Sequence, residues 1–271
     1  LVDLSNVNYE LASSLNCDVV DGSNPSQYLK CIKNEVEVKN TIQAHIKDGV
    51  AVTKFMYWLK NNVGKIEMNE INTAEYLTSL RAKQDLFIEP SFSTISAYGK
   101  NAALMHYHAT KEHASPLENK GFLLVDSGGQ YYDGTTDITR TFVLGEISDI
   151  QKKHFTLVLK GMLNLQRIKF LHGQTGIDLD VLSRAPMWNE GIDYQCGTGH
   201  GVGHLLCVHE GPNEFRPKSR TGCPVALQVG MITTDEPGIY IEGQYGIRLE
   251  NELLCQKDIK NEYGQYMSFK C

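Results

Sequence analysis

Two segments that should form buried strands each adjoin an aspartate. Leu123 to Val125 run directly into Asp126, and Asp137 lies beside a second β-prone run, ITRTFV. Burying a lone ionised carboxylate costs several kcal/mol, roughly, after relaxation. A chain with this pattern must therefore supply a positive charge beside the two strands.

Asp126 and Asp137 are 11 positions apart, with a turn signal between them at Tyr131 to Gly134. A hairpin folded there places the two side chains roughly opposite each other on one face, where like charges repel. A divalent cation such as Mg, Mn, Zn or Ca would remove the repulsion, because carboxylates are hard oxygen ligands. The alternative is a pair of surface aspartates, with Asp133 and Gly134 forming an ordinary turn.

A second cluster is CGTGHGVGHLLCVHEGP, from Cys196 to Pro212. Four glycines surround His200 and His204, which argues against a regular helix. The C-x3-H-x3-H spacing of Cys196, His200 and His204 would suit zinc, but only a helix would place all three on one face. For His204 we expect an ordinary core or loop histidine.

A third cluster is TTDEPGIYIEGQYGIRLEN. Glu236 precedes Pro237, so its backbone is extended, and Glu250 follows 14 residues later in an apolar strand. Glu250 alone could pair with Arg248 on a solvated edge. Together with the two aspartates and His200, however, the glutamates make a sensible two-metal site, in which ions lie ~3.5–4 Å apart.

Four helices are expected from apolar spacing and capping signals. They cover Asn34 to Asn62; a segment opened by Asn72 and Glu75 and reaching Lys83; Ser148 to His172, stopped by Gly173; and a segment from Asp178 that bends or ends near Pro186. Strands are expected at 102–107, 121–128, 137–144, 205–209, 227–235 and 246–255. Because the strands come as hairpins, we predict an α/β or α+β fold with a curved, mainly antiparallel sheet.

Composition excludes several classes of protein. A net charge of -6 argues against nucleic acid as a partner, and no apolar run approaches the roughly 18 residues of a membrane helix. Seven cysteines without a CxxC pair fit a reducing compartment, so we expect a cytoplasmic protein. From the two ends of the chain, we expect residues 1–31 to be a linker or edge segment from a missing N-terminal region. Residues 32–271 would then be a catalytic domain with a truncated C-terminus.

The ordered motifs resemble the metallopeptidases of the pita-bread fold, which include methionine aminopeptidase, prolidase and Xaa-Pro aminopeptidase. The strings DSGGQYYDGTTDITRTF, GTGHGVGH, VHEGP, EPGIY and GIRLEN look most like Xaa-Pro aminopeptidase, and the likeness runs from about residue 20 to the end. The resemblance implies a curved antiparallel sheet flanked by helices. It also implies a metal-dependent aminopeptidase that releases the N-terminal residue from peptides with proline in second position, and possible homodimers of the full-length protein.

The resemblance also implies roles for the metal ligands. Asp126 would bind one metal, and His200 and Glu236 would hold the other. Asp137 and Glu250 would bridge both, with Glu236 also the general base that activates a metal-bridging hydroxide. Manganese is the family's usual metal, with zinc or cobalt as alternatives.

Four further residues match family positions beside the metals. His106 would contact the substrate near the scissile bond, and His209 would stabilise the tetrahedral intermediate. Tyr240 and Arg248 would orient the ligand carboxylates.

One position departs from the family pattern. The family usually reads HGTGHG where this chain reads CGTGHG, so Cys196 stands in place of a histidine. Compensation by His204 is one hypothesis. Prolidase and methionine aminopeptidase are the alternative enzymes, since their metal ligands are the same in kind. A weakened or non-catalytic binding scaffold is the alternative outside the enzymes, although scaffolds of this fold have generally lost several of the five ligands.

Overall fold

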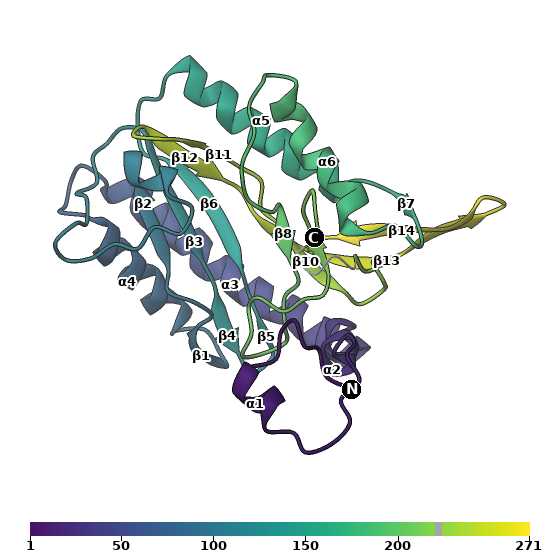
Figure 1. Cartoon of the computed structure of the whole chain (residues 1–271). Coiled ribbons are helices and arrows are strands. Elements are labelled where there is room, and N and C mark those ends of the chain that lie inside the picture. The colour runs from purple at the N-terminus through teal and green to yellow at the C-terminus, as the bar shows by residue number, and fades with distance from the viewer. Residues whose placement is uncertain (220–223) are drawn as a thin grey trace.

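A 28-residue helix, α3 (Glu35–Asn62), runs along one face of the central strands in the computed structural model, which describes residues 1–219 and 224–271 (Figure 1). The Asn34 side chain accepts hydrogen bonds from the backbone of the first turn, and the Glu37 carboxylate accepts one from the Asn34 backbone N–H. Buried residues then recur every three or four positions, as at Ala51, Phe55 and Leu59. The sequence therefore fixes both the start of this helix and the face that it buries.

The other helices are α1 (Tyr9–Ser13), α2 (Pro25–Cys31), α4 (Glu70–Arg81), η1 (Gly99–Ala103), α5 (Asp149–Gln166) and α6 (Gly176–Trp188). The strands are β1 (Phe87–Pro90), β2 (Ile95–Tyr98), β3 (Phe122–Ser127), β4 (Gly129–Tyr131), β5 (Gly134–Thr135), β6 (Ile138–Val143), β7 (Phe170–Leu171), β8 (Gly199–His200), β9 (Glu214–Phe215), β10 (Ile232–Asp235), β11 (Gly238–Ile241), β12 (Tyr245–Arg248), β13 (Asn251–Asn261) and β14 (Gly264–Lys270). Over the described residues, no helix combines the length and apolar character that crossing a membrane requires.

All the strand pairs are antiparallel in the described part of the chain, in the orders β2-β3-β6, β10-β13-β14-β7, β1-β4-β5, β11-β12 and β8-β9. The strands lie between α3 and α4 on one side and α5 and α6 on the other (Figure 1). Phe55 and Leu59 of α3 pack against Leu123 and Val125 on the first side. On the second side, α5 packs against β11 and β12. The expected class, mixed helix and curved antiparallel sheet, is confirmed.

The predicted start of α4 and the predicted end of α5 were wrong. Helix α4 is capped by Asn69, with Asn72 as the third residue of the capping box, so it starts at Glu70 and not after Asn72. Helix α5 has the expected Ser148 cap but ends at Gln166, so that Phe170 and Leu171 can form β7 against β14. Helix α6 continues two residues past Pro186.

Two of the expected strands do not form. Over 102–107 the chain makes η1 and then a turn, with local bonds such as Tyr107 N to Leu104 O in place of a ladder. Over 205–209, Leu205 and Leu206 have φ values of 68° and 75°, which lie in the left-handed region and are incompatible with a strand. Residues 1–31 contain α1 and α2, and their role as a linker stays a prediction.

Candidate metal centre

Asp126 lies near the end of β3, opposite Thr139 of β6. One of its oxygens, Oδ2, accepts a hydrogen bond of 2.6 Å from Arg248 Nη2. The other, Oδ1, is buried and has no hydrogen-bond partner in the described structure. A buried carboxylate oxygen without a donor is free to bind a cation.

Asp137 and Glu250 each lie one residue before a strand, β6 and β13 respectively, and both are buried. The Asp137 backbone N–H donates to Glu252 Oε1 at 2.8 Å, which fixes the start of β6. Thr139 Oγ1 donates to Glu250 Oε2 at 2.8 Å. Glu252 thus fixes the backbone of Asp137, Thr139 fixes the carboxylate of Glu250, and neither of these two neighbours is a cation.

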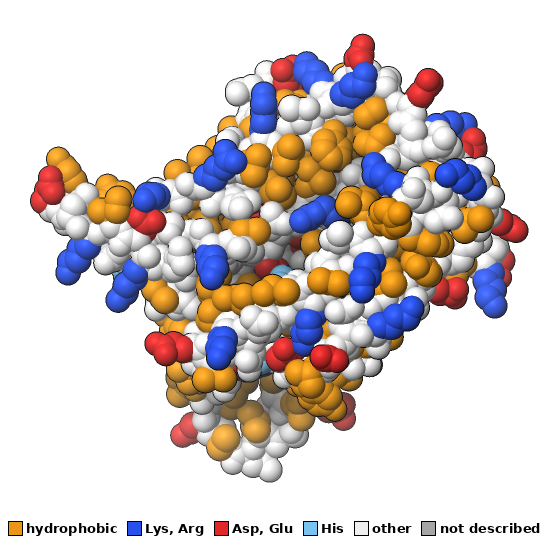
Figure 2. Space-filling view, turned by 180° about the vertical axis from the view of Figure 1, so that it is seen from behind, with side chains coloured by type: hydrophobic (Ala, Val, Ile, Leu, Met, Phe, Trp, Pro, Cys, Tyr) orange, Lys and Arg blue, Asp and Glu red, His pale blue; other side chains and the backbone are white. Residues whose placement is uncertain are grey.

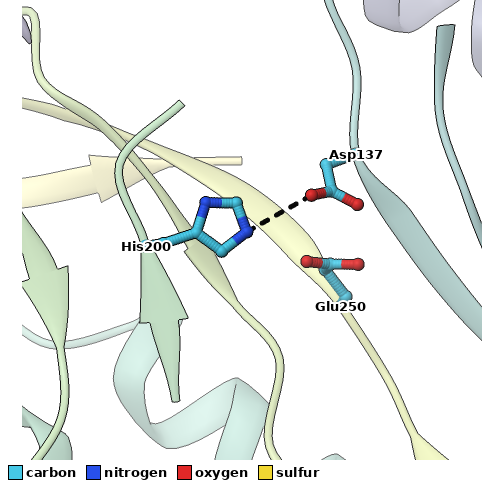
Figure 3. A group of neighbouring side chains, drawn as sticks. All are labelled: Asp137, His200 and Glu250. Atoms are coloured by element: carbon cyan, nitrogen blue, oxygen red, sulfur yellow. Dashed lines mark ion pairs between the residues drawn. The ribbon is translucent and has the colours of Figure 1, made fainter. Parts of the chain in front are cut away.

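His200, on β8, points its Nε2 at this group (Figure 3). Nε2 lies 3.3 Å from Asp137 Oδ2 and 3.5 Å from Glu236 Oε1. Its Nδ1 lies 2.9 Å from the Gly201 carbonyl oxygen, an arrangement that places a proton on Nδ1. In the neutral tautomer, Nε2 then offers its lone pair to a metal.

Glu236 follows β10 directly, and the β10–β13 register pairs Asp235 with Asn251. Glu236 and Glu250 therefore lie at the adjoining ends of neighbouring strands. The Glu236 backbone N–H donates to the Thr198 carbonyl oxygen at 2.7 Å, and Thr234 Oγ1 donates to Glu236 Oε1 at 3.1 Å.

These residues meet at a cavity of about 310 Å³. Figure 2 shows a hollow in the surface with acidic and histidine side chains visible inside it. Asp126, Asp137, His200 and Glu236 line the cavity. Glu250 lies beside it, since one ligand atom from each of Asp137, His200 and Glu250 falls within 4.8 Å of the others. All five predicted ligands are thus brought to one place.

The site carries more negative than positive charge. Burial, together with the charges of Asp126 and Glu236, raises the pKa of Asp137 to about 7. Burial and the neighbouring Asp137 raise the pKa of Glu250 well above its usual value. The pKa of His200 rises to about 9, because Asp137 and Glu236 outweigh its burial.

The donor set fits divalent metal ions. It consists of carboxylate oxygens and one imidazole nitrogen, the ligands that Mn²⁺, Zn²⁺ and Co²⁺ accept. The open Oδ1 of Asp126 and the raised pKa values of Asp137 and Glu250 both show a deficit of positive charge that such ions would supply.

The four other predicted residues, His106, His209, Tyr240 and Arg248, also line the cavity. The His209 ring lies edge-on to that of His200, with centroids 4.2 Å apart. Arg248 is buried and donates to Tyr240 Oη at 2.9 Å as well as to Asp126. His106 is exposed, on the loop that follows η1.

Cys196 and His204 differ in their positions. Cys196 lines the cavity, and burial raises the pKa of its thiol to about 11, so the thiol is neutral. His204 is not among the residues lining the cavity, and its Nδ1 lies 3.2 Å from Thr41 Oγ1 on α3. In the described ranges, neither joins His200 in a metal-binding group, so the structure gives no support to the C-x3-H-x3-H zinc site or to compensation by His204.

Sequence reasoning assigned no role to Glu252, Arg216 or Thr139. Glu252 holds the backbone of Asp137, and strand alternation from Glu250 was a signal that could have found it. Arg216 lines the cavity and pairs with Glu214 at 2.8 Å, and no sequence signal marks it.

Comparison with known proteins gives a consistent result. The model of metallopeptidase family M24 matches residues 39–257. A probable Xaa-Pro aminopeptidase P from Pyrenophora teres f. teres is 43% identical over 246 residues, which are 89% of this chain and 37% of that protein. The chain thus spans about two fifths of the length of this curated relative.

Solved structures agree with the sequence matches. X-prolyl aminopeptidase from Caenorhabditis elegans, described as a cytosolic enzyme with a di-nuclear active site, superposes with a TM-score of 0.86 at 37% identity, over 92% of this chain and 40% of that one. Xaa-Pro dipeptidase from Bacillus anthracis gives 0.79 at 27% identity, over 97% and 70%. The family model covers most of the chain, and these structures share its fold. The chain belongs to metallopeptidase family M24.

Proposed function

We propose that this chain is the catalytic part of a metal-dependent aminopeptidase that removes the N-terminal residue from peptides with proline in second position. The observation that carries the proposal is the convergence of Asp137, His200 and Glu250 beside a cavity that Asp126 and Glu236 also line. The 43% identity to a probable Xaa-Pro aminopeptidase P supports the choice of substrate. Residues 32–271 would be the catalytic domain and 1–31 the segment that leads into it.

Two divalent ions would be held by Asp126, Asp137, His200, Glu236 and Glu250, with Asp137 and Glu250 shared between them. When bound, the ions would polarise the substrate carbonyl and lower the pKa of a bound water, so that hydroxide is available at neutral pH. Manganese is the first metal to test, with zinc or cobalt as alternatives. The Caenorhabditis elegans protein, with its di-nuclear site and cytosolic description, supports two ions and a cytoplasmic location. A homodimer of the full-length protein is also part of the proposal.

The chain's own residues would share the remaining work. Glu236, with a pKa raised by burial, would accept a proton from the attacking water. Arg248 would fix the carboxylate of Asp126, which it contacts at 2.6 Å. His106 and His209 both line the cavity, where His106 would bind the peptide and His209 would stabilise negative charge on its carbonyl oxygen.

The test uses three peptides and added Mn²⁺: an Xaa-Pro-Xaa tripeptide, an Xaa-Pro dipeptide and a Met-Ala-Ser peptide, with products followed by mass spectrometry. Release of the first residue from the tripeptide alone is the expected result. EDTA and the Asp137→Asn variant should both abolish it. Cleavage of the dipeptide alone would assign a prolidase, the activity of the less similar Bacillus anthracis structure.

Cleavage of the methionyl peptide alone would assign a methionine aminopeptidase and contradict the proposal. If all three peptides survive, the Cys196→His variant should be tried next, because Cys196 lines the cavity at a position where the family usually has histidine. Failure of both proteins to cleave any peptide, while they bind metal, would favour the binding scaffold.

A further inference from the structure

Glu70 is a fully buried carboxylate outside the metal centre. It is the first residue of α4. Its Oε1 accepts hydrogen bonds from the Tyr98 backbone N–H at 2.6 Å and from Asn101 Nδ2 at 3.0 Å. Its Oε2 accepts from Tyr107 Oη at 2.7 Å and from the Ser115 backbone N–H at 2.8 Å.

This carboxylate is satisfied by hydrogen bonds and not by a cation. Within residues 1–219 and 224–271, no lysine, arginine or histidine forms an ion pair with Glu70. Each of its two oxygens accepts hydrogen bonds from two donor groups, and the dipole at the N-terminus of α4 favours the negative charge. Both oxygens must therefore accept, which a carboxylate can do and an amide cannot.

The four donors are distributed along a single loop. Tyr98 and Ser115 lie just outside the two ends of 99–114, and Asn101 and Tyr107 lie inside it. One side chain thus ties both ends and the middle of the loop to the start of α4. These hydrogen bonds add to the apolar packing of Ala102 and Tyr107 against Ala97 and Leu124.

The same loop carries His106, which lines the cavity together with Met105. Tyr107, the next residue, bonds to Glu70. On the cavity side, Arg248 Nη2 donates to the Met105 carbonyl oxygen at 3.4 Å. The short run from Met105 to Tyr107 is therefore held between a residue of the metal centre and Glu70.

We propose that Glu70 is a positioning residue that fixes His106 in the substrate cavity. The inference rests on the proposed function, because Glu70 would act on the reaction only through His106. Displacing a substrate-contacting group by about 1 Å can cost roughly 100-fold in rate. Loss of the Glu70 carboxylate should therefore slow peptide cleavage strongly without removing any metal ligand.

The test compares Glu70→Gln with Tyr107→Phe, and uses Glu75→Gln as the matched control, since Glu75 is exposed on the same helix. Each substitution is made in the native chain and in His106→Ala. We expect kcat/KM to fall about 100-fold in Glu70→Gln and about tenfold in Tyr107→Phe, while Glu75→Gln stays at the native value. In the His106→Ala background, the first two substitutions should each change kcat/KM less than about twofold.

Hydrogen exchange supplies a second reading that does not depend on activity. Peptides covering 104–114 should exchange faster in Glu70→Gln and Tyr107→Phe, and Mn²⁺ binding should be unchanged. Unchanged exchange over 104–114 would overturn the proposal, as would an equal loss of activity with and without His106. If Glu70→Gln fails to fold, Tyr107→Phe decides alone. If the native chain cleaves no peptide, the proposed function fails, and exchange over 104–114 still decides whether Glu70 holds the loop.

Discussion

Two buried groups of charged side chains in this molecule are built in opposite ways. Between α3 and α4, Asp48 accepts hydrogen bonds from Arg81 at 2.7 and 2.8 Å and from Tyr131 Oη at 2.8 Å. Burial acts to raise the pKa of Asp48, but Arg81 outweighs it, and the pKa lies below its usual value. At the metal centre, burial raises the pKa of Asp137 to about 7.

The first group stabilises the fold, whereas the second is arranged to bind a ligand. Asp48 and Arg81 neutralise each other's charge within the chain and need no cation, although Arg81 Nη1 has no hydrogen-bond partner in the described structure. The metal centre places several carboxylates around His200 and leaves an oxygen of Asp126 without a donor. This cluster of carboxylates destabilises the fold unless cations are bound, and charge clusters of this kind are typical of binding sites.

The largest expected effect is on the Asp48–Arg81 pair. Asp48→Ala leaves the Arg81 guanidinium buried without its partner, and we expect the free energy of unfolding in EDTA to fall by about 3–5 kcal/mol. Urea denaturation measures the change. Asp149→Ala, which removes an exposed carboxylate paired only with Lys152, is the control and should leave stability unchanged. A loss equal to that of the control would contradict the comparison.

At the metal centre, the next effect should depend on metal. Mn²⁺ at about 100 times its dissociation constant should add about 2.7 kcal/mol to the unfolding free energy of the native chain. Asp137→Asn should gain less stability from Mn²⁺ than the native chain does. In EDTA it should be at least as stable as the native chain, because a repelling charge is gone. Marked destabilisation of this variant in EDTA would show that Asp137 serves the fold.

The pH dependence of stability should have opposite signs at the two sites. In the metal-free chain, folded Asp137 keeps a proton that the unfolded chain loses above about pH 3.8, so stability falls as pH rises to about 7. The stabilising contribution of His200 is complete below about 6.5 and is lost as pH rises to about 9. Asp48 instead contributes above about 3.8 and is lost as pH falls further. Urea titrations in EDTA should therefore show a flatter slope between pH 4 and 7 for Asp137→Asn, and an unchanged slope would refute the assignment.

The smallest effect is expected at His204, which belongs to neither group. Its Nδ1 bonds to Thr41, away from the cavity lining. His204→Ala should change kcat/KM on the Xaa-Pro-Xaa peptide less than about twofold, since only a hydrogen bond outside the site is lost. A large loss of activity would revive the idea that His204 compensates for Cys196.

Short-range sequence signals predicted where several helices begin. Asn34 and Ser148 are caps that act within one turn, so the starts of α3 and α5 could be read from sequence. The end of α5 could not, because it depends on β14 pairing with Phe170 about 100 residues away. Leu205 and Leu206 adopt left-handed backbone, and the Leu205 N–H donates to Thr135 Oγ1, a long-range contact that no propensity encodes.

Some residues of the candidate site could likewise be identified from the sequence, and others could not. Asp126 and Asp137 were recognisable because a carboxylate beside apolar strand residues needs an explanation. His106 and His209 lie in irregular loops, and only the resemblance to a family pointed to them. Glu70 carried no signal, since its four donors lie 28 to 45 positions away along the chain.

The central claim is that the metal centre binds a pair of divalent ions, and calorimetric titration of the metal-free chain with Mn²⁺ near neutral pH tests it most directly. We predict two ions per chain, with release of protons from His200 and Asp137 that appears as a dependence of the heat on the buffer, and loss of at least one ion in Asp137→Asn. A chain that binds no Mn²⁺, or an Asp137→Asn variant that binds it as the native chain does, would contradict the account.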